Sequence, residues 1–278
     1  MNFPKFWAKG THQGFIAWRW SDLNLAEAET LAKEAARRVA ERFARDELHR
    51  QRYAYADRPL REPVLREFRD AAGQLAAAIT RNSYGCLVLN TARLMFVDVD
   101  FPEPQVSLGS WFKRLFGKAE PASDNKPETH TLAQAEAWAQ RNPGWGWRVY
   151  RTRAGMRLMA THALFEPDAA STLSAFDALG SDPLYRQLCK IQKCFRARLT
   201  PKPWRCDLPN PPSRWPWTNA KEEALFHAWE RDSLQACGEF ATCTLVASFG
   251  SKVVHPEVQE LLKVHDETTR AQTKVDLA

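Results

Sequence analysis

The stretch Leu94-Met95-Phe96-Val97-Asp98-Val99-Asp100 decides how the rest of the chain is interpreted. Its apolar residues are rich in aromatic and β-branched side chains and predict a buried strand. Side chains alternate faces along a strand, so Asp98 and Asp100 are expected on the same side. Two such carboxylates repel each other and lose hydration, so they need a compensating cation. Divalent metal ions in phosphate chemistry supply one. The alternative is a strand end at which one Asp caps the turn at Pro102 and the other is solvated.

Composition indicates a soluble globular protein. Of the 278 residues, 44% are hydrophobic and 26% are charged, and no apolar run approaches the roughly 18 residues of a membrane span. The N-terminal residues lack the charged and apolar regions of a signal peptide, and six irregularly spaced cysteines do not form a disulfide framework. We therefore expect a cytoplasmic location.

The charge balance is compatible with a polyanionic partner. The net charge is +6, from 39 basic and 33 acidic residues, and the chain has 11 tryptophans. Aromatic faces beside cations can stack bases and hold phosphates, although they also occur where Trp fills a core and Arg lies over its edge. Four stretches place Trp next to Arg: Trp18-Arg19-Trp20, Trp147-Arg148, Trp204-Arg205 and Arg214-Trp215.

Periodicity and capping residues predict an alternating series of strands and helices. We expect strands at 13–20, 82–90, 94–100, 145–152, 156–162 and 242–249, and helices at 24–46, 62–79, 131–142, 183–195, 219–235 and 256–272. The short connection 90–93 predicts an antiparallel hairpin between 82–90 and 94–100, and Arg153-Ala154-Gly155 predicts a second hairpin. Hairpins separated by helices indicate an α+β fold with a mostly antiparallel sheet and helices mainly on one face.

We interpret residues 1–278 as a single domain with peripheral parts. These are an N-terminal strand and helices (1–81), a surface insertion (102–130) and a C-terminal helix-strand-helix part (211–278). An aromatic island at 111–116 within the insertion is either a satellite contact or a partner site.

Two segments have the composition of anion-binding sites. The hairpin tip with Thr152, Arg153 and Gly155 offers backbone N–H groups, a hydroxyl and a guanidinium in one turn, which suits phosphate. The segment 194–207 is the most basic in the chain and is held by two prolines, so it predicts a preformed anion-binding surface; a solvated basic loop is the alternative.

The order of these motifs resembles the archaeo-eukaryotic primase superfamily, the primase-polymerases, over about residues 82–210. That family has a hydrophobic-Asp-x-Asp strand, a hairpin with a small-residue, Gly and His element, and a later third Asp, on an RRM-like sheet. Asp98 and Asp100 match the first element. Thr152-Arg153-Ala154-Gly155-Met156-Arg157 is similar to the second, with Arg157 standing where the family has His, and Asp207 is the candidate for the third. The whole chain also resembles uncharacterised bacterial proteins that share the segment Phe-Arg-Ala-Arg-Leu-Thr-Pro-Lys-Pro-Trp-Arg-Cys found at 195–206.

The resemblance implies a metal-dependent nucleotidyltransferase that acts on DNA or RNA with a nucleoside triphosphate. Catalytic Asp98, Asp100 and Asp207 would hold Mg²⁺ or Mn²⁺. The resemblance implies that the triphosphate is bound by Thr152, Arg153, Gly155 and Arg157. The residues implied to meet the nucleic-acid backbone are Arg196, Arg198, Lys202 and Arg205.

Two other functions remain open beside the nucleotidyltransferase. Arg157 in place of His removes a contact to the incoming nucleotide, so a catalytically degenerate nucleic-acid- or nucleotide-binding protein on the same fold is the second interpretation. A metal-dependent nuclease is the third, since an acid pair and a basic cleft also serve phosphodiester hydrolysis. The cysteines with His227 could hold zinc, but they lack CxxC spacing and are expected to be buried thiols.

Overall fold

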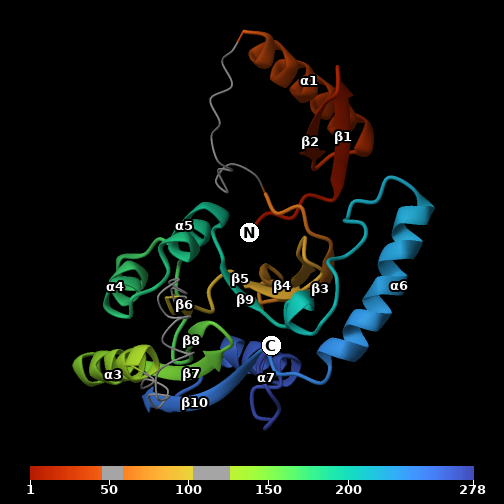
Figure 1. Cartoon of the computed structure of the whole chain (residues 1–278). Coiled ribbons are helices and arrows are strands. Elements are labelled where there is room, and N and C mark those ends of the chain that lie inside the picture. Colours follow the sequence, from red (N-terminus) through yellow and green to blue (C-terminus); the bar gives the residue numbers. More distant parts are fainter. Residues whose placement is uncertain (46–58, 103–125) are drawn as a thin grey trace, which may run out of the picture. The chain divides into compact units, whose positions relative to one another are not determined.

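The computed structural model describes residues 1–45, 59–102 and 126–278 (Figure 1). The aromatic island and most of the predicted insertion therefore lie outside the described residues. The chain divides into two compact units, each made of two separate segments. Unit 1 comprises Met1–Ala92 and Gln187–Glu239, and unit 2 comprises Arg93–Arg186 and Phe240–Ala278. The sequence shows no linker at these divisions, because the chain changes unit within a short connection and within a helix.

Unit 1 contains two antiparallel sheets and the helices beside them. Its elements are β1 (Phe6–His12), β2 (Phe15–Ser21), α1 (Leu25–Ala44), β3 (Val64–Arg69), β4 (Leu75–Arg81), β5 (Leu87–Thr91), β9 (Phe195–Arg198), the short 3-10 helix η1 (Pro203–Arg205) and α6 (Ala220–Cys237). The strand order is β1-β2 in one sheet and β3-β4-β5-β9 in the other. Helix α5 (Pro183–Gln192) carries the chain from unit 2 back into unit 1.

Helix α1 packs closely on the β1-β2 hairpin because the contacting residues are small. A Cβ at Gly10 would lie 2.1 Å from the backbone of Ala32, so only glycine permits this approach. Ala28, Ala32 and Ala36 are fully buried on the facing side of the helix. Asn24 begins the helix, accepting a hydrogen bond of 2.9 Å from the Glu27 N–H, as its sequence predicts.

Two predictions for unit 1 are wrong. Residues 62–79 do not form a helix but the β3-β4 hairpin, whose turn is closed by Asp70 accepting from the Ala72 and Gln74 N–H groups and by Gly73 at φ +77°. The predicted pairing of 82–90 with 94–100 is also wrong. The turn at Asn82 folds β5 back onto β4, and β5 pairs on its other side with β9.

Unit 2 is built on one four-stranded antiparallel sheet with the order β10-β7-β8-β6. Its elements are β6 (Phe96–Asp100), α3 (Lys126–Arg141), β7 (Gly146–Thr152), β8 (Gly155–Ala160), α4 (Ala170–Ala178), β10 (Cys243–Gly250) and α7 (Pro256–Thr269). The β7-β8 hairpin confirms the second predicted hairpin. The α+β class with mostly antiparallel sheets is confirmed as well, although the strands form three sheets.

The sheet of unit 2 is buried on both faces. Trp147 and Tyr150 lie three positions apart on β7, so they occupy opposite faces, and both are almost fully buried. His265 of α7 packs against the Tyr150 side, with ring centroids 4.8 Å apart. The Trp147 side meets Trp145, which in turn contacts Trp138 of α3. Among the described residues, the helices include none with the length and apolar character needed to cross a membrane.

Candidate functional site

Strand β6 presents the predicted acid pair on one face. The register with β8 places Asp98 opposite Arg157 and Asp100 opposite Gly155. Because the two aspartates are two positions apart, they share the face of the sheet that also carries Tyr150. The Asp98 side chain is 35% exposed and Asp100 is exposed, so solvent reaches both carboxylates.

The backbone beneath Asp98 is fixed from its outer side. The Asp98 carbonyl accepts a hydrogen bond of 2.8 Å from the Asp182 N–H, and the Phe96 carbonyl accepts one of 3.2 Å from the Tyr185 hydroxyl. The Asp182 side chain caps the start of α5 by accepting from the Tyr185 N–H at 2.7 Å. Two carbonyl groups on the outer edge of β6 are therefore bonded, which helps to fix the strand that carries the acid pair.

Arg157 supplies a cation to Asp98 from within the chain. Its Nε lies 3.9 Å from Asp98 Oδ1, and its own side chain is only 5% exposed. On the other side, its terminal nitrogen lies 3.4 Å from His265 Nε2. The guanidinium is thus enclosed between a carboxylate and an imidazole, so it compensates part of the charge of the acid pair.

A chain of buried polar groups continues from Arg157 through helix α7. His265 Nδ1 lies 3.0 Å from Asp266 Oδ1, and Asp266 also accepts from the Tyr150 hydroxyl at 2.8 Å and from Arg148 at 2.5 Å. Burial lowers the pKa of His265 to about 4, so its imidazole is neutral near pH 7. A neutral ring that donates from Nδ1 to Asp266 accepts from Arg157 at Nε2, which fixes the tautomer.

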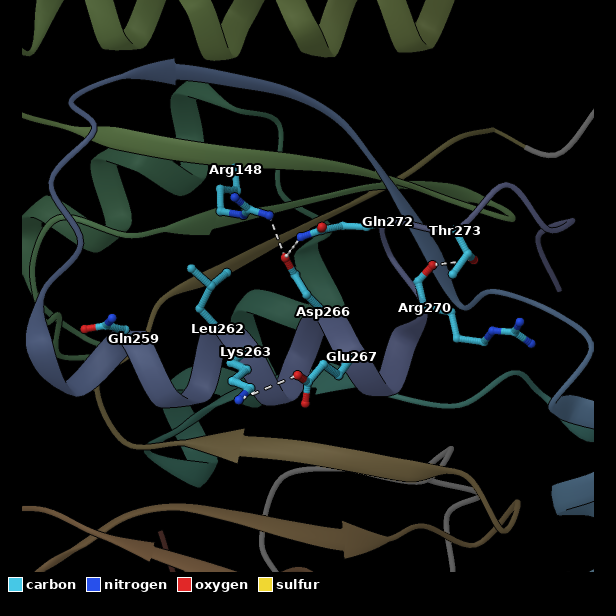
Figure 2. A pocket seen from close by; sticks show the side chains of 9 residues that line it. All are labelled: Arg148, Gln259, Leu262, Lys263, Asp266, Glu267, Arg270, Gln272 and Thr273. Atoms are coloured by element: carbon cyan, nitrogen blue, oxygen red, sulfur yellow. Dashed lines mark hydrogen bonds and ion pairs between the residues drawn. The ribbon is translucent and has the colours of Figure 1, made fainter.

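A pocket of about 610 Å³ opens beside this chain of groups (Figure 2). Figure 2 shows Arg148 and Gln272 both directed at the Asp266 carboxylate on the pocket wall. Arg270 and Lys263 add two further cations to the lining. Asp266 therefore lines the pocket and also bonds the buried His265.

The buried state of His265 predicts that acid destabilises the protein. The pKa of His265 is about 4 when folded and about 6.5 when unfolded, so the unfolded chain binds a proton first as the pH falls. The contribution of neutral His265 to the free energy of unfolding is fully present above pH 6.5. It is lost as the pH falls from about 6.5 to 4, by up to roughly 3 kcal/mol. The charged and titratable groups that face the ring are Arg157, Asp266, Tyr150 and Arg148.

Thermal melting between pH 7 and pH 4 checks this expectation. The His265→Gln variant keeps a polar side chain that does not titrate, so its melting temperature should fall less with acid than that of the native protein. His130→Gln, which changes an exposed histidine, should retain the native slope. Equal slopes for the native protein and His265→Gln would contradict the assignment.

The predicted phosphate-binding tip of the β7-β8 hairpin is partly occupied by internal bonds. Arg153 is exposed and donates to the Leu277 carbonyl at 3.0 Å, while Thr152 is largely buried. Gly155 lies so close to β6 that a Cβ would fall 2.0 Å from the Val99 carbonyl oxygen. The hairpin tip and the acid pair therefore lie on neighbouring strands of the unit 2 sheet, because β8 pairs with β7 on one side and with β6 on the other.

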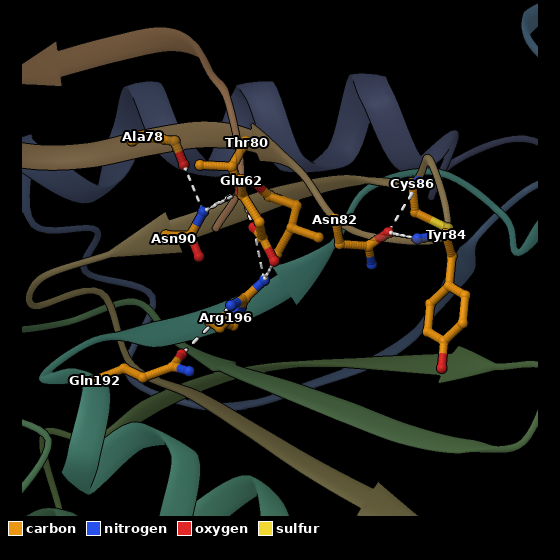
Figure 3. Close-up of polar contacts among 10 residues, drawn as sticks. Glu62, Ala78, Thr80, Asn82, Tyr84, Cys86, Asn90, Gln192 and Arg196 are labelled. Carbon is orange, nitrogen blue, oxygen red and sulfur yellow. Dashed lines mark hydrogen bonds and ion pairs between the residues drawn. The ribbon is translucent and has the colours of Figure 1, made fainter. Parts of the chain in front are cut away.

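The remaining predicted site residues belong to unit 1. Arg196 is half-buried on β9 and donates to both oxygens of Glu62, at 2.8 and 3.0 Å, while Glu62 also accepts from Thr80 (Figure 3). The Arg196 guanidinium is therefore already engaged in an ion pair within unit 1. Arg198, Lys202 and Arg205 are half-buried, and Asp207 is exposed with φ +57°. The acid pair belongs to unit 2, so the prediction that these unit 1 residues lie beside it stays a prediction. The residues concerned are Arg196, Arg198, Lys202, Arg205 and Asp207.

The acid pair suits a hard divalent cation in its donor chemistry. Carboxylate oxygens are ligands that Mg²⁺ and Mn²⁺ prefer, and Mg²⁺ is commonly held by one or two carboxylates together with water and substrate phosphates. Within residues 1–45, 59–102 and 126–278, no three His, Cys, Asp or Glu side chains gather as one metal-binding group. Asp98 and Asp100 alone would therefore hold such an ion in unit 2, next to Arg157.

His265 and Asp266 are not among the residues that the sequence predicts for a site. Both lie on the inward side of α7, whose buried positions include Val258, Leu261 and Thr269. The available signal for a buried polar group was a single histidine at helical spacing on an otherwise mostly apolar face. A neighbouring aspartate strengthens it, because a buried imidazole needs a partner for its N–H group.

Comparison with protein-family models, curated proteins and solved structures finds no match to this chain.

Proposed function

We propose that the protein is a metal-dependent nucleotidyltransferase of primase-polymerase type, using nucleic acid and a nucleoside triphosphate. The observation that supports this most is the accessible acid pair, Asp98 and Asp100, on one face of a strand whose outer edge is fixed by Asp182. Paired carboxylates on a rigid strand end are the arrangement that phosphoryl-transfer sites use to hold divalent ions.

Each residue of unit 2 has a defined part in this proposal. Asp98 and Asp100 hold Mg²⁺ or Mn²⁺, which when bound neutralises charge on the attacking and leaving oxygens. Arg157 provides a positive charge beside Asp98, since its Nε lies 3.9 Å from Asp98 Oδ1. The hairpin tip with Thr152 and Arg153 binds the triphosphate. The resemblance to the primase-polymerases further implies Asp207, in unit 1, as the third carboxylate and the basic residues of 196–205 as contacts for the nucleic-acid backbone.

Nucleotide incorporation tests the proposal. Purified protein with Mn²⁺, a primed template and labelled nucleoside triphosphates should extend the primer, whereas Asp98→Ala/Asp100→Ala should form no product. The loss is expected to exceed a hundredfold because both carboxylate ligands of the ions are removed. The Asp207→Ala variant should also lose activity if this carboxylate completes the site.

The matched control is Glu136→Ala/Glu267→Ala, which removes two exposed carboxylates of unit 2, one on α3 and one on α7. It should retain full incorporation. Product formed by native protein and by Asp98→Ala/Asp100→Ala at equal rates would overturn the assignment. Strand scission with metal and without nucleotide would identify a nuclease instead.

A second candidate is a non-catalytic protein that binds nucleic acid or nucleotide. The contact between Arg157 and Asp98 favours it, because a guanidinium next to the acid pair supplies part of the compensating charge without a metal ion. In this case no product forms under any metal condition. Nucleic-acid binding then survives Asp98→Ala/Asp100→Ala unchanged.

A further inference from the structure

We infer that a pocket in unit 1 binds a nucleotide of single-stranded nucleic acid, with the base against aromatic side chains and the phosphate against arginines. The pocket has a volume of about 290 Å³ and lies wholly within unit 1. Its walls come from the residues before and in β3, from the end of β4, and from α6 with the loop before it. None of the predicted site residues lines it, so this inference does not rest on the metal chemistry proposed for unit 2.

Aromatic side chains form one part of the lining. Trp215, Trp217, Phe226 and His227 all face the pocket. Trp217 lies 5.4 Å from the Phe226 ring and 5.2 Å from the His227 ring, measured between centroids, so three of these rings form one packed group. Indole rings offer the large planar faces on which a nucleobase stacks.

Guanidinium groups form the other part. The lining contains Arg61, Arg81 and Arg214 against one carboxylate, Glu230, which leaves an excess of positive charge. Arg81 is paired with Glu230, and Glu230 also bonds His227 at 2.8 Å, so these groups are held in place by one another. Arg214 is exposed and makes no ion pair with any residue that the structure describes. It is therefore available for a phosphate, which it can bind through two nitrogens.

A second aromatic position lies on the same turn and favours a strand over a free nucleotide. Ser83 of the β4-β5 turn lines the pocket, and the next residue, Tyr84, is 40% exposed. Tyr84 meets Trp204, which is 45% exposed, edge to face with centroids 5.2 Å apart. Lys202 places its ammonium 5.3 Å from the Trp204 ring. One turn thus joins two places where an aromatic face and a cation occur together, as successive nucleotides require.

The glycine of this turn keeps it against α6. A Cβ at Gly85 would lie 2.2 Å from the Trp229 ring, and the Trp229 indole N–H donates to the Pro209 carbonyl at 3.0 Å. Trp229 is thus bonded to the loop before α6 and packed against the turn. The two sides of the pocket are therefore fixed relative to each other before any ligand binds, which lowers the entropic cost of binding.

Fluorescence polarisation with a short fluorescein-labelled oligothymidylate at low salt tests the inference. Arg214→Ala and Trp215→Leu are each expected to weaken binding about tenfold, through loss of a phosphate contact and of a stacking face. Trp215→Phe should recover most of the affinity because it restores an aromatic face. The matched control is Arg231→Ala, which removes an exposed arginine of α6 outside the pocket and should bind like the native protein.

Calorimetric titration with AMP separates the two sources of the same chemistry. Tight binding of the oligonucleotide with weak binding of AMP supports a nucleic-acid strand as the ligand. Binding of AMP alone, which Arg214→Ala and Trp215→Leu abolish, supports a free nucleotide instead. Native affinity in both variants overturns the inference, as does binding of neither ligand. Native melting temperatures for Arg214→Ala, whose side chain is exposed, exclude unfolding as the cause. Primer extension in Arg214→Ala at saturating template reports separately on the acid pair.

Discussion

Replacing Asp266 by alanine is expected to lower the free energy of unfolding by about 3–5 kcal/mol. Asp266 accepts from Tyr150, Arg148, His265 and Gln272, and only 8% of its surface is exposed. Although burial alone raises the pKa of Asp266, hydrogen bonds from His265 and Tyr150 and the nearby charges hold it below its usual value. Removing the carboxylate leaves buried donors without their acceptor, which costs more than the lost bonds themselves.

Urea denaturation followed by circular dichroism measures this loss. The neighbouring Glu267→Ala variant is the control, since Glu267 is exposed on the same helix and, among the residues that the structure describes, its carboxylate forms an ion pair only with Lys263, at 3.9 Å. Its cost should stay within about 0.5 kcal/mol. Similar midpoints for the two variants would mean that the groups around Asp266 find other partners or water. Asp266→Asn, which keeps the shape and loses the charge, should lie between them.

Replacing Gly155 by alanine is expected to cost about 3 kcal/mol and to suppress the proposed activity. The added Cβ would lie 2.0 Å from the Val99 carbonyl oxygen and 3.0 Å from the Asp100 Cα, and both of these atoms belong to the backbone. The strand β6 must therefore move, and it carries Asp100. A shift of the carboxylate by a fraction of an ångström is enough to weaken a site that depends on geometry.

The adjacent variant Ala154→Ser is the matched control, because Ala154 is exposed at the hairpin tip. It should change stability by less than about 0.5 kcal/mol and leave primer extension intact. Native stability in Gly155→Ala would show that β6 and β8 can separate locally at no cost. Reduced stability with unchanged activity would instead place the reacting groups away from Asp100.

Local signals in the sequence predicted the elements whose determinants lie close together in the chain. Asn24 and Asn219 each accept from the N–H three residues later, at 2.9 Å, and both helices begin where these caps predict. The β7-β8 hairpin follows from the turn Arg153-Ala154-Gly155 in the same way. The shared face of Asp98 and Asp100 needed only the two-residue period of a strand.

Pairings between distant segments could not be predicted. Strand β6 pairs with β8 and β5 with β9, and the second of these pairs joins Val88 to Arg198. No residue near β5 indicates that partner, whereas the short connection to β6 suggested the wrong one. The contact of Arg157 with His265 joins residues 108 positions apart, so it could not be predicted from local signals either. Residues 62–79 were misassigned because Ala, Glu and Leu favour helices in isolation, while pairing with β5 decides the structure.

The interleaving of the two units has a consequence for synthesis on the ribosome. The unit 1 sheet gains its fourth strand only when β9 emerges, and the unit 2 sheet is incomplete until β10 (Cys243–Gly250) has been made. Until then the edge of β5 and the edge of β7 are unpaired in the nascent polypeptide, and such edges readily join other chains. Translation must therefore reach Glu239 before unit 1 is complete and must pass β10 before unit 2 is complete, which makes the newly made protein a candidate for chaperone protection.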